Sequence, residues 1–413
     1  MVVETFGGSS LQSEPLTVYL GADDFSNFAN PTKRTADVES VERSLLEWRD
    51  AGKLELVFAL PHVLEVAPTV PEAIEFARPR LNCIKRLCGS RCLADPQRLL
   101  EHELSKITKS GVRHRNLQVH RNDGEWFPEI DPTGWKKPDI AMLVRDELAA
   151  SASGNREARR KQKRTVFSGA GTLKAAAKQA LHVTTLQAAA AIAQKYPLTE
   201  SAALAISRYL AGKDSAENAL AGIKESLTDL DCYGEWFELH WAEVEGTASW
   251  LRQIGEQLRH SIVNSAVHGE FLREQMLSSG AQTAEIARLF ETQFDQQMST
   301  YPNRFAGKMA NAFGLGEPCT EIDCDTAPSF MAFAGVAAQV LRYSAFDITN
   351  SKQRRPRRSD FGDVLHSLYL PCVDVFRADG FSAMAIAQAH LPFTASVVSF
   401  KALVPTIQQR LTL

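Results

Sequence analysis

The sequence predicts an α/β protein whose parallel sheet is built from both ends of the chain, with an all-α segment between them. Residues 1–108 alternate strand and helix patterns, and residues 347–413 return to that alternation. Between them, residues 112–137 are polar and irregular, as in a connecting loop, and residues 138–346 are almost entirely helical in pattern. Alternating β and α patterns are typical of a parallel sheet covered by helices. We therefore expect two half-domains, 1–108 and 347–413, interrupted by a helical insertion, 109–346.

The N-terminal half-domain has two short strand patterns, each followed by helices. Residues 16–21 and 54–59 are rich in apolar and β-branched side chains, which favours buried strands. Between them, residues 38–51 have the apolar spacing of an amphipathic helix, with Gly52 just past its last turn. Pro61 favours a helical turn directly after the second strand. Two further helices are expected at 71–89 and 95–109.

The middle of the chain carries helix patterns with no fixed-period repeat. Its aromatic side chains, such as Trp236, fall at helical spacing and are interpreted as core residues. The expected helices span residues 173–195, 201–212, 216–227, 235–268, 283–298 and 328–346. We predict an insertion of six or more helices that recognises a substrate or a protein partner.

Composition limits the protein class. The chain has 413 residues, of which 44% are hydrophobic and 23% charged, and its formal net charge is −3. These values predict a globular protein of two or three domains that does not bind polyanions over its whole surface. No apolar run is long enough for a membrane span, and no secretory signal pattern is present. Seven cysteines without a Cys-x-x-Cys pair favour reduced thiols in a cytoplasmic protein rather than a zinc site.

The chemistry is concentrated in residues 359–381. This stretch has the pattern of a short helix, a break at Pro371, a buried strand and a turn. Its carboxylates, Asp363, Asp374 and Asp379, fall near the ends of that helix and strand. In open α/β sheets the crevice at the carboxyl ends of the strands is the usual ligand site. Clustered carboxylates there suit a hard divalent cation, which prefers oxygen ligands.

The same stretch carries a family resemblance. Asp363-x-x-His366-x-x-Tyr-Leu-Pro, followed by Val-Asp374-Val-Phe-x-x-Asp379, resembles the C-terminal part of a PIN-like nuclease domain. PIN domains are metal-dependent nucleases that mostly act on RNA, with three or four acidic residues around the metal. The resemblance covers roughly residues 16–100 and 355–413. It implies a cytoplasmic endoribonuclease using Mg²⁺ or Mn²⁺, with a role as a toxin or defence effector.

The resemblance implies a set of site residues. Glu65, Asp363 and Asp379 match the metal ligands, and Asp23 is the candidate fourth. Glu65 on its own would be a surface carboxylate, and it becomes a candidate ligand because of the C-terminal motif. The catalytic set further includes His366, which positions a ligand or phosphate, and Asp374, which orients the ligands. For His366 the alternative is a partly buried helix histidine, and for Asp374 a structural role.

One position departs from the family pattern. The first strand of a PIN-like domain ends in an Asp at about the position of Gly21, and that carboxylate is missing here. Either Asp23 or Asp24 takes its place, or the site is weakened or inactivated. The alternative role for both acids is helix capping, which we favour for Asp24. If the site is only weakened, Gly21→Asp is expected to raise activity.

Two basic runs interrupt the pattern. Such runs either neutralise nucleic-acid phosphates or form solvated linkers. The first run is equally compatible with both roles, and the second is predicted to contact RNA because it leads directly into the acidic motif. The first run contains Arg156, Arg159, Arg160, Lys161, Lys163 and Arg164, and the second contains Lys352, Arg354, Arg355, Arg357 and Arg358.

Three functional hypotheses follow. The first is a metal-dependent endoribonuclease. The second is a catalytically inactive PIN-like module that binds RNA or protein, which the glycine at position 21 makes plausible. The third is a helical interaction scaffold whose α/β part is only structural.

Overall fold

The protein is organised around a four-stranded parallel sheet that joins the two ends of the chain. The strands are β1 (Leu16–Tyr19), β2 (Leu54–Val57), β5 (Val375–Arg377) and β6 (Ser396–Val398), in the order β2-β1-β5-β6. The structure is a computed structural model that describes residues 14–67, 73–108, 117–135, 156–168, 172–239, 260, 263–264, 267–343, 357 and 359–412. The predicted mixed α/β class is confirmed, and β1 of the N-terminal half pairs directly with β5 of the C-terminal half.

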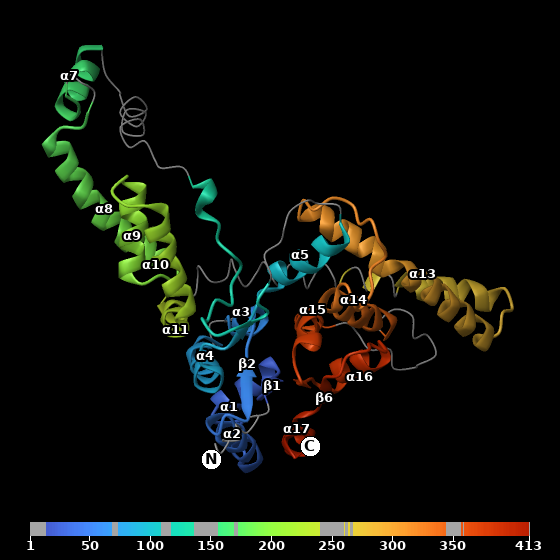
Figure 1. The fold of residues 1–413 in the computed structure, drawn as a ribbon. Coiled ribbons are helices and arrows are strands. Elements are labelled where there is room, and N and C mark those ends of the chain that lie inside the picture. The colour runs from blue at the N-terminus through green and yellow to red at the C-terminus, as the bar shows by residue number, and fades with distance from the viewer. Residues whose placement is uncertain are drawn as a thin grey trace, which may run out of the picture.

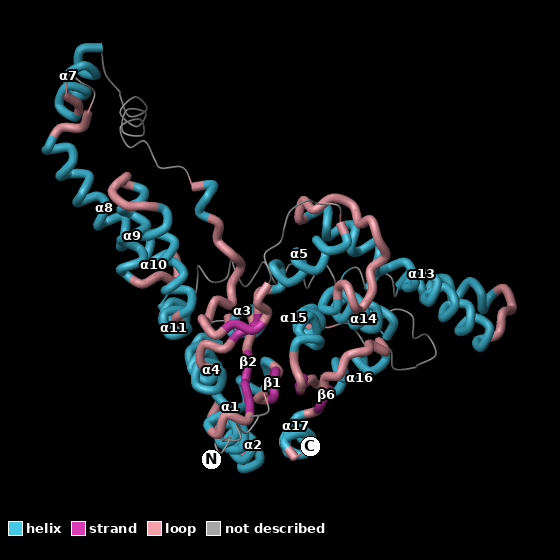
Figure 2. The backbone as a smooth tube through the Cα atoms, in the orientation of Figure 1, coloured by secondary structure: helices cyan, strands magenta, loops and turns pink. Residues whose placement is uncertain are grey.

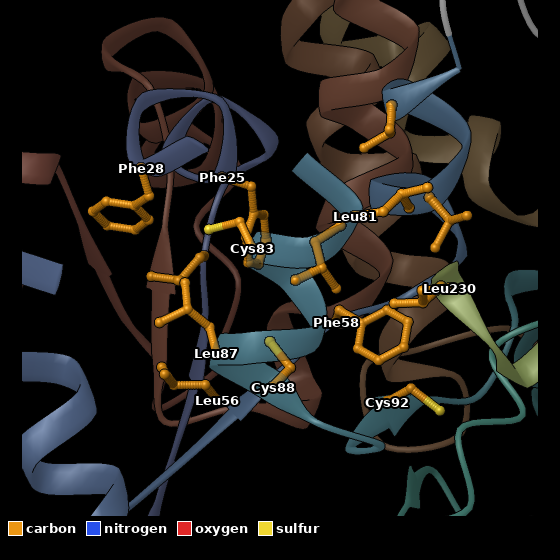
Figure 3. Close-up of a cluster of buried hydrophobic side chains, with 14 of the residues drawn as sticks. Phe25, Phe28, Leu56, Phe58, Leu81, Cys83, Leu87, Cys88, Cys92 and Leu230 are labelled. Atoms are coloured by element: carbon orange, nitrogen blue, oxygen red, sulfur yellow. The ribbon is translucent and has the colours of Figure 1, made fainter. Parts of the chain in front are cut away.

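Helices cover both faces of this sheet, because successive side chains of a strand point to opposite faces. Val18, Leu56 and Val375 lie in one buried cluster, whereas Tyr19, Val57 and Phe376 lie in another. The first cluster contains α1 (Ala22–Ala29), α2 (Ala36–Asp50), α4 (Ile74–Cys88) and α17 (Phe400–Leu411), and Figure 3 shows part of it. The second contains α5 (Pro96–Ile107), α15 (Asp360–His366) and α16 (Gly380–Gln388). Strands that are buried on both faces are mostly apolar along their whole length, and β1, β5 and β6 follow this pattern.

Local signals explain where several of these helices begin. Thr35 accepts a hydrogen bond from the backbone of Val38 at the start of α2. Asp95 accepts from Gln97 and Arg98, and Pro96 occupies the first position of α5. A two-stranded antiparallel ribbon of β3 (Cys92–Leu93) and β4 (His120–Arg121) flanks α5, so a short strand lies inside residues 112–137, which were expected to form a connecting loop.

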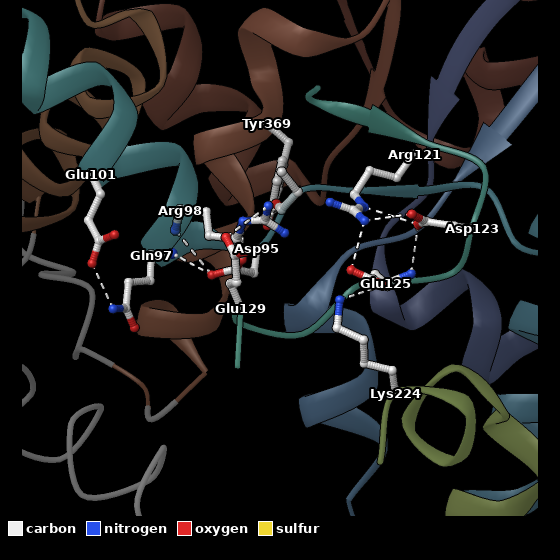
Figure 4. A network of polar contacts seen from close by, with 11 residues as sticks. Asp95, Gln97, Arg98, Glu101, Arg121, Asp123, Glu125, Glu129, Lys224 and Tyr369 are labelled. Carbon is white, nitrogen blue, oxygen red and sulfur yellow. Dashed lines mark hydrogen bonds and ion pairs between the residues drawn. The ribbon is translucent and has the colours of Figure 1, made fainter. Parts of the chain in front are cut away.

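Polar contacts join this ribbon to its surroundings, as Figure 4 shows. Arg121 pairs with Asp123 and Glu125, and Glu125 also accepts from Lys224 at 2.9 Å. The Tyr369 hydroxyl donates to the backbone carbonyl of Ala94 at 3.0 Å. The ribbon is thus tied both to the central helices and to the C-terminal half.

The helices between the two halves form two groups rather than one body (Figure 1). The first group reaches the core where α11 packs on α4, supported by the ion pair of Arg78 and Glu235 at 3.2 Å. Trp126 also donates to the carbonyl of Leu227 at 3.0 Å. This group contains α8 (Ala175–Lys195), α9 (Glu200–Leu210), α10 (Ala216–Thr228) and α11 (Leu230–Leu239), and η2 (Pro132–Gly134) and α7 (Arg156–Val166) precede it.

The second group belongs to the core itself. Helices α13 (Thr283–Ala312) and α14 (Pro328–Leu341) contribute to the second buried cluster. The buried Glu103 of α5 accepts from the backbone N–H groups of Ser329 (3.0 Å) and Phe330 (2.9 Å) at the start of α14. The single insertion domain expected from the sequence is therefore divided by its packing. Much of the long helix expected at 235–268 lies outside the described residues.

The C-terminal half follows the expected order, with one shift. A 3₁₀ turn, η4 (Ser367–Cys372), extends α15, so β5 begins only at Val375. Helix α3 (Leu60–Val66) follows β2 and faces α15, and Figure 2 shows the short strands enclosed by helices. All seven cysteines are free, and no described helix is long and apolar enough to cross a membrane.

Candidate functional site

A polar pocket of about 210 Å³ lies at the carboxyl ends of β1 and β5. Parallel strands direct their carboxyl ends to the same edge, where side chains from distant segments meet. Asp23 comes from the first turn of α1, Glu65 from α3, Asp363 from α15 and Asp379 from the start of α16. All four residues line the pocket, as does His366. The four acids predicted as metal ligands are thus brought to one place.

The carboxylates influence one another electrically. The pKa of Asp363 is raised to about 7, first by burial and then by the negative charges of Asp379 and Glu65. Like charges that share a site make ionisation less favourable. This carboxyl group is therefore partly protonated near neutral pH unless a cation joins the cluster.

Glu65 is held by a buried hydrogen-bonded chain. His366 Nε2 lies 3.2 Å from Glu65 Oε1, and His366 Nδ1 lies 2.6 Å from the hydroxyl of Tyr19. Burial raises the pKa of Tyr19 well above its ordinary value, so its hydroxyl stays protonated and can donate to Nδ1. A neutral His366 then carries its proton on Nε2 and donates it to Glu65. His366 is both a buried helix histidine and a positioning group for Glu65.

A glycine makes room for this arrangement. A Cβ atom at Gly362 would lie under 3.0 Å from Glu65 Oε1, so the carboxylate could not stay where it is. The carboxylate of Glu65 therefore lies against the backbone of α15, and any larger residue at position 362 would displace it. The neighbouring His62 does not join the site, because its two ring nitrogens bond the backbone of Ala59 and Leu20.

Arg377 lines the pocket beside Gly21 and contacts the buried Asp24 behind it. Asp24 Oδ2 accepts from the backbone N–H of Gly21 at 2.8 Å, which confirms its predicted capping role. Its Oδ1 pairs with Arg377 Nε at 2.9 Å. Burial raises the pKa of Asp24 to about 6, although the charge of Arg377 acts to lower it. The ion pair is therefore largely withdrawn from water.

The same arginine fills the place where the family pattern has a carboxylate. A Cβ atom at Gly21 would lie 2.8 Å from Arg377 Nη1. The sequence interpretation missed Arg377, although this residue ends β5 two positions before Asp379, within the stretch 359–381 that carries the predicted acids. Its reach across from β5 to the end of β1 depends on the pairing of these two strands.

The structure corrects the predicted position of Asp374, which does not line the pocket. Its Oδ2 accepts from the backbone N–H of Thr17 at 2.8 Å, and it immediately precedes β5. It thus lies at the amino end of the strand, whereas the pocket lies at the carboxyl end. Its prediction as a catalytic residue is therefore not upheld, and its alternative structural role is the one that the structure shows.

The basic runs are only partly described. Of the second run, Arg357 is exposed and lines the pocket beside Ser359. Lys352, Arg354, Arg355 and Arg358 lie outside the described residues. The first run lies along α7, away from the sheet (Figure 1).

The donor set has the chemistry of a Mg²⁺ or Mn²⁺ site, since carboxylate oxygens are the ligands these ions prefer. The spacing is more open than in a formed site. Within the described parts of the chain, no three His, Cys, Asp or Glu side chains are grouped closely enough to hold a metal ion as they stand. The pocket therefore gathers suitable ligands without presenting a finished coordination shell.

Comparisons with known proteins identify no relative of this chain. No protein-family model, curated protein or solved structure matches the chain. The resemblance to PIN-like nucleases therefore depends on the quoted motif residues alone.

Proposed function

We propose that the chain is a PIN-like endoribonuclease, interrupted by helical insertions, that hydrolyses RNA with Mg²⁺ or Mn²⁺. The observation that supports it most is the convergence of Asp23, Glu65, Asp363 and Asp379 in one pocket from four separate elements. Four acids in one small pocket repel one another, which is unfavourable without a cation among them. The pKa of Asp363 is raised first by burial, and the charges of Asp379 and Glu65 add to that rise.

The proposed roles follow from the placement of each residue. Glu65, Asp363 and Asp379 would hold the ion, with Asp23 as the fourth ligand. When bound, the ion would lower the pKa of an attacking water and stabilise charge on the phosphate. His366 orients Glu65 through the bond between them. Arg357, at the mouth of the pocket, would attract the RNA backbone.

A cleavage assay tests this proposal. Labelled single-stranded RNA and DNA are incubated with Mn²⁺, Mg²⁺ or EDTA, using the wild-type protein and Asp363→Asn. We expect RNA cleavage that requires the metal and is lost in the variant. Asp374→Asn is the matched control, because it removes a carboxylate of the same motif outside the pocket. Cleavage that persists in EDTA or in Asp363→Asn would exclude this centre.

A second candidate function is an RNA-binding module without catalysis. The observation that favours it is the guanidinium of Arg377 beside Gly21, where the family has a metal-binding carboxylate. The structure also alters the expectation for Gly21→Asp, because a carboxylate there would pair with Arg377 instead of facing a metal. Metal-independent RNA binding without cleavage in the same assay would favour this candidate.

A further inference from the structure

The pocket contains polar groups that the carboxylate cluster does not use. Arg377 pairs with Asp24 through Nε, its side chain is only 11% exposed, and its terminal nitrogens are not needed for that ion pair. Ser382 is only 8% exposed, and its hydroxyl has no partner among the described residues. Both residues line the pocket. A buried hydroxyl without a partner is uncommon in proteins, and this one lies in the same pocket as the Arg377 guanidinium.

The nature of that ligand follows from the donors. A guanidinium presents its N–H groups in a planar fork that matches the oxygens of a phosphate, and a serine hydroxyl can add another donor. The backbone N–H of Ser382 is not part of this set, because Asp379 already accepts from it at 2.6 Å. The donors that carry the inference are thus the two side chains.

We propose that Arg377 and Ser382 form a phosphate subsite that holds a backbone phosphate of an RNA strand beside the carboxylates. This inference depends on the proposed action on RNA. It gives a physical reason for Gly21, since a side chain there would meet the guanidinium. Arg377 then takes the space of the missing carboxylate for substrate binding.

The test measures RNA binding without cleavage. Fluorescence anisotropy of a labelled single-stranded RNA is recorded in EDTA, with every protein carrying Asp363→Asn to suppress hydrolysis. Two variants are compared in this background: Asp24→Asn alone, and Asp24→Asn with Arg377→Gln. Both lack the buried ion pair, so they differ only in whether position 377 carries the guanidinium.

We expect the variant that lacks Arg377 to bind RNA about tenfold more weakly than its partner, as for the loss of a charge-assisted hydrogen bond. Ser382→Ala in the same background should weaken binding about threefold, as for a neutral hydrogen bond. Equal affinities of the two Asp24→Asn variants would overturn the proposal. A purely structural Arg377 would give that result, provided that both proteins unfold at the same temperature.

If the protein with Asp24→Asn and Arg377→Gln does not fold, a different pair of variants still tests the subsite. Gly21→Asp leaves Arg377 in place but adds a carboxylate next to its guanidinium. We expect weaker RNA binding than with Gly21→Asn, which has the same shape without the charge. Equal binding by the two proteins would contradict the subsite. The outcome is independent of the cleavage assay, so a failed subsite and a failed nuclease can be told apart.

Discussion

Because Glu65 lies close to Gly362, the substitution Gly362→Ala is expected to lower activity while leaving stability nearly unchanged. Gly362 lies within α15, where alanine is the better helix former by about 1 kcal/mol. The added Cβ would, however, lie under 3.0 Å from Glu65 Oε1 and 3.3 Å from its Cδ. Glu65 is a flexible side chain with 38% of its surface exposed, so its carboxylate is expected to rotate away.

The effects on stability nearly cancel. Rotation of Glu65 breaks its 3.2 Å contact with His366. A hydrogen bond of this kind contributes about 1 kcal/mol net, which offsets the gain in helix propensity. We therefore expect Gly362→Ala to change the free energy of unfolding by less than about 1 kcal/mol. Displacing a catalytic group by about 1 Å can lower a rate about 100-fold, and we expect a loss of that order.

The assay is single-turnover RNA cleavage together with urea unfolding of the same proteins. Glu65→Ala provides the matched background, since it removes the group with which the methyl collides. In that background Gly362→Ala should leave the residual cleavage unchanged and stabilise the protein by about 1 kcal/mol. Full activity of Gly362→Ala, or an equal further loss of activity in the Glu65→Ala background, would refute the reasoning.

Two further predictions concern the acids of the C-terminal motif. In EDTA, the free energy of unfolding should fall as pH rises from about 4 to about 7, because the folded protein holds a proton on Asp363, whose pKa is about 7 instead of 3.8. Asp363→Asn should make this slope shallower in urea unfolding across that range, and an unchanged slope would contradict the assignment. Asp374→Asn should cost about 1 kcal/mol of stability through its weaker bond to Thr17 while cleavage per folded molecule stays the same. A variant with normal stability and abolished cleavage would return Asp374 to the catalytic set.

The convergence of the four acids was predictable because it follows from topology. Asp23, Glu65 and Asp379 each stand just past a strand pattern, and parallel strands bring such positions to one edge. Asp363 joins them because α15 faces α3. The sheet itself was predictable for the same reason, since strand–helix alternation returns at the end of the chain.

Other features depend on contacts that no local pattern encodes. The reach of Arg377 to Gly21 requires the pairing of β1 with β5, and the fit of Glu65 against Gly362 requires the packing of α3 on α15. Asp374 was misplaced because the 3₁₀ turn continues through Cys372 and delays the strand. The division of the middle helices into two groups depends on which faces they bury, and helical periodicity does not name the partner.

The central claim is that this pocket binds a divalent cation. It is tested most directly by anomalous diffraction from crystals of the protein grown with Mn²⁺, beside crystals of Asp363→Asn grown in the same way. We predict an anomalous peak in the wild-type pocket, with the carboxylates of Glu65, Asp363 and Asp379 drawn in around it, and no peak in the variant. A pocket without manganese in the wild-type crystals, or a peak that persists unchanged in Asp363→Asn, would contradict the account.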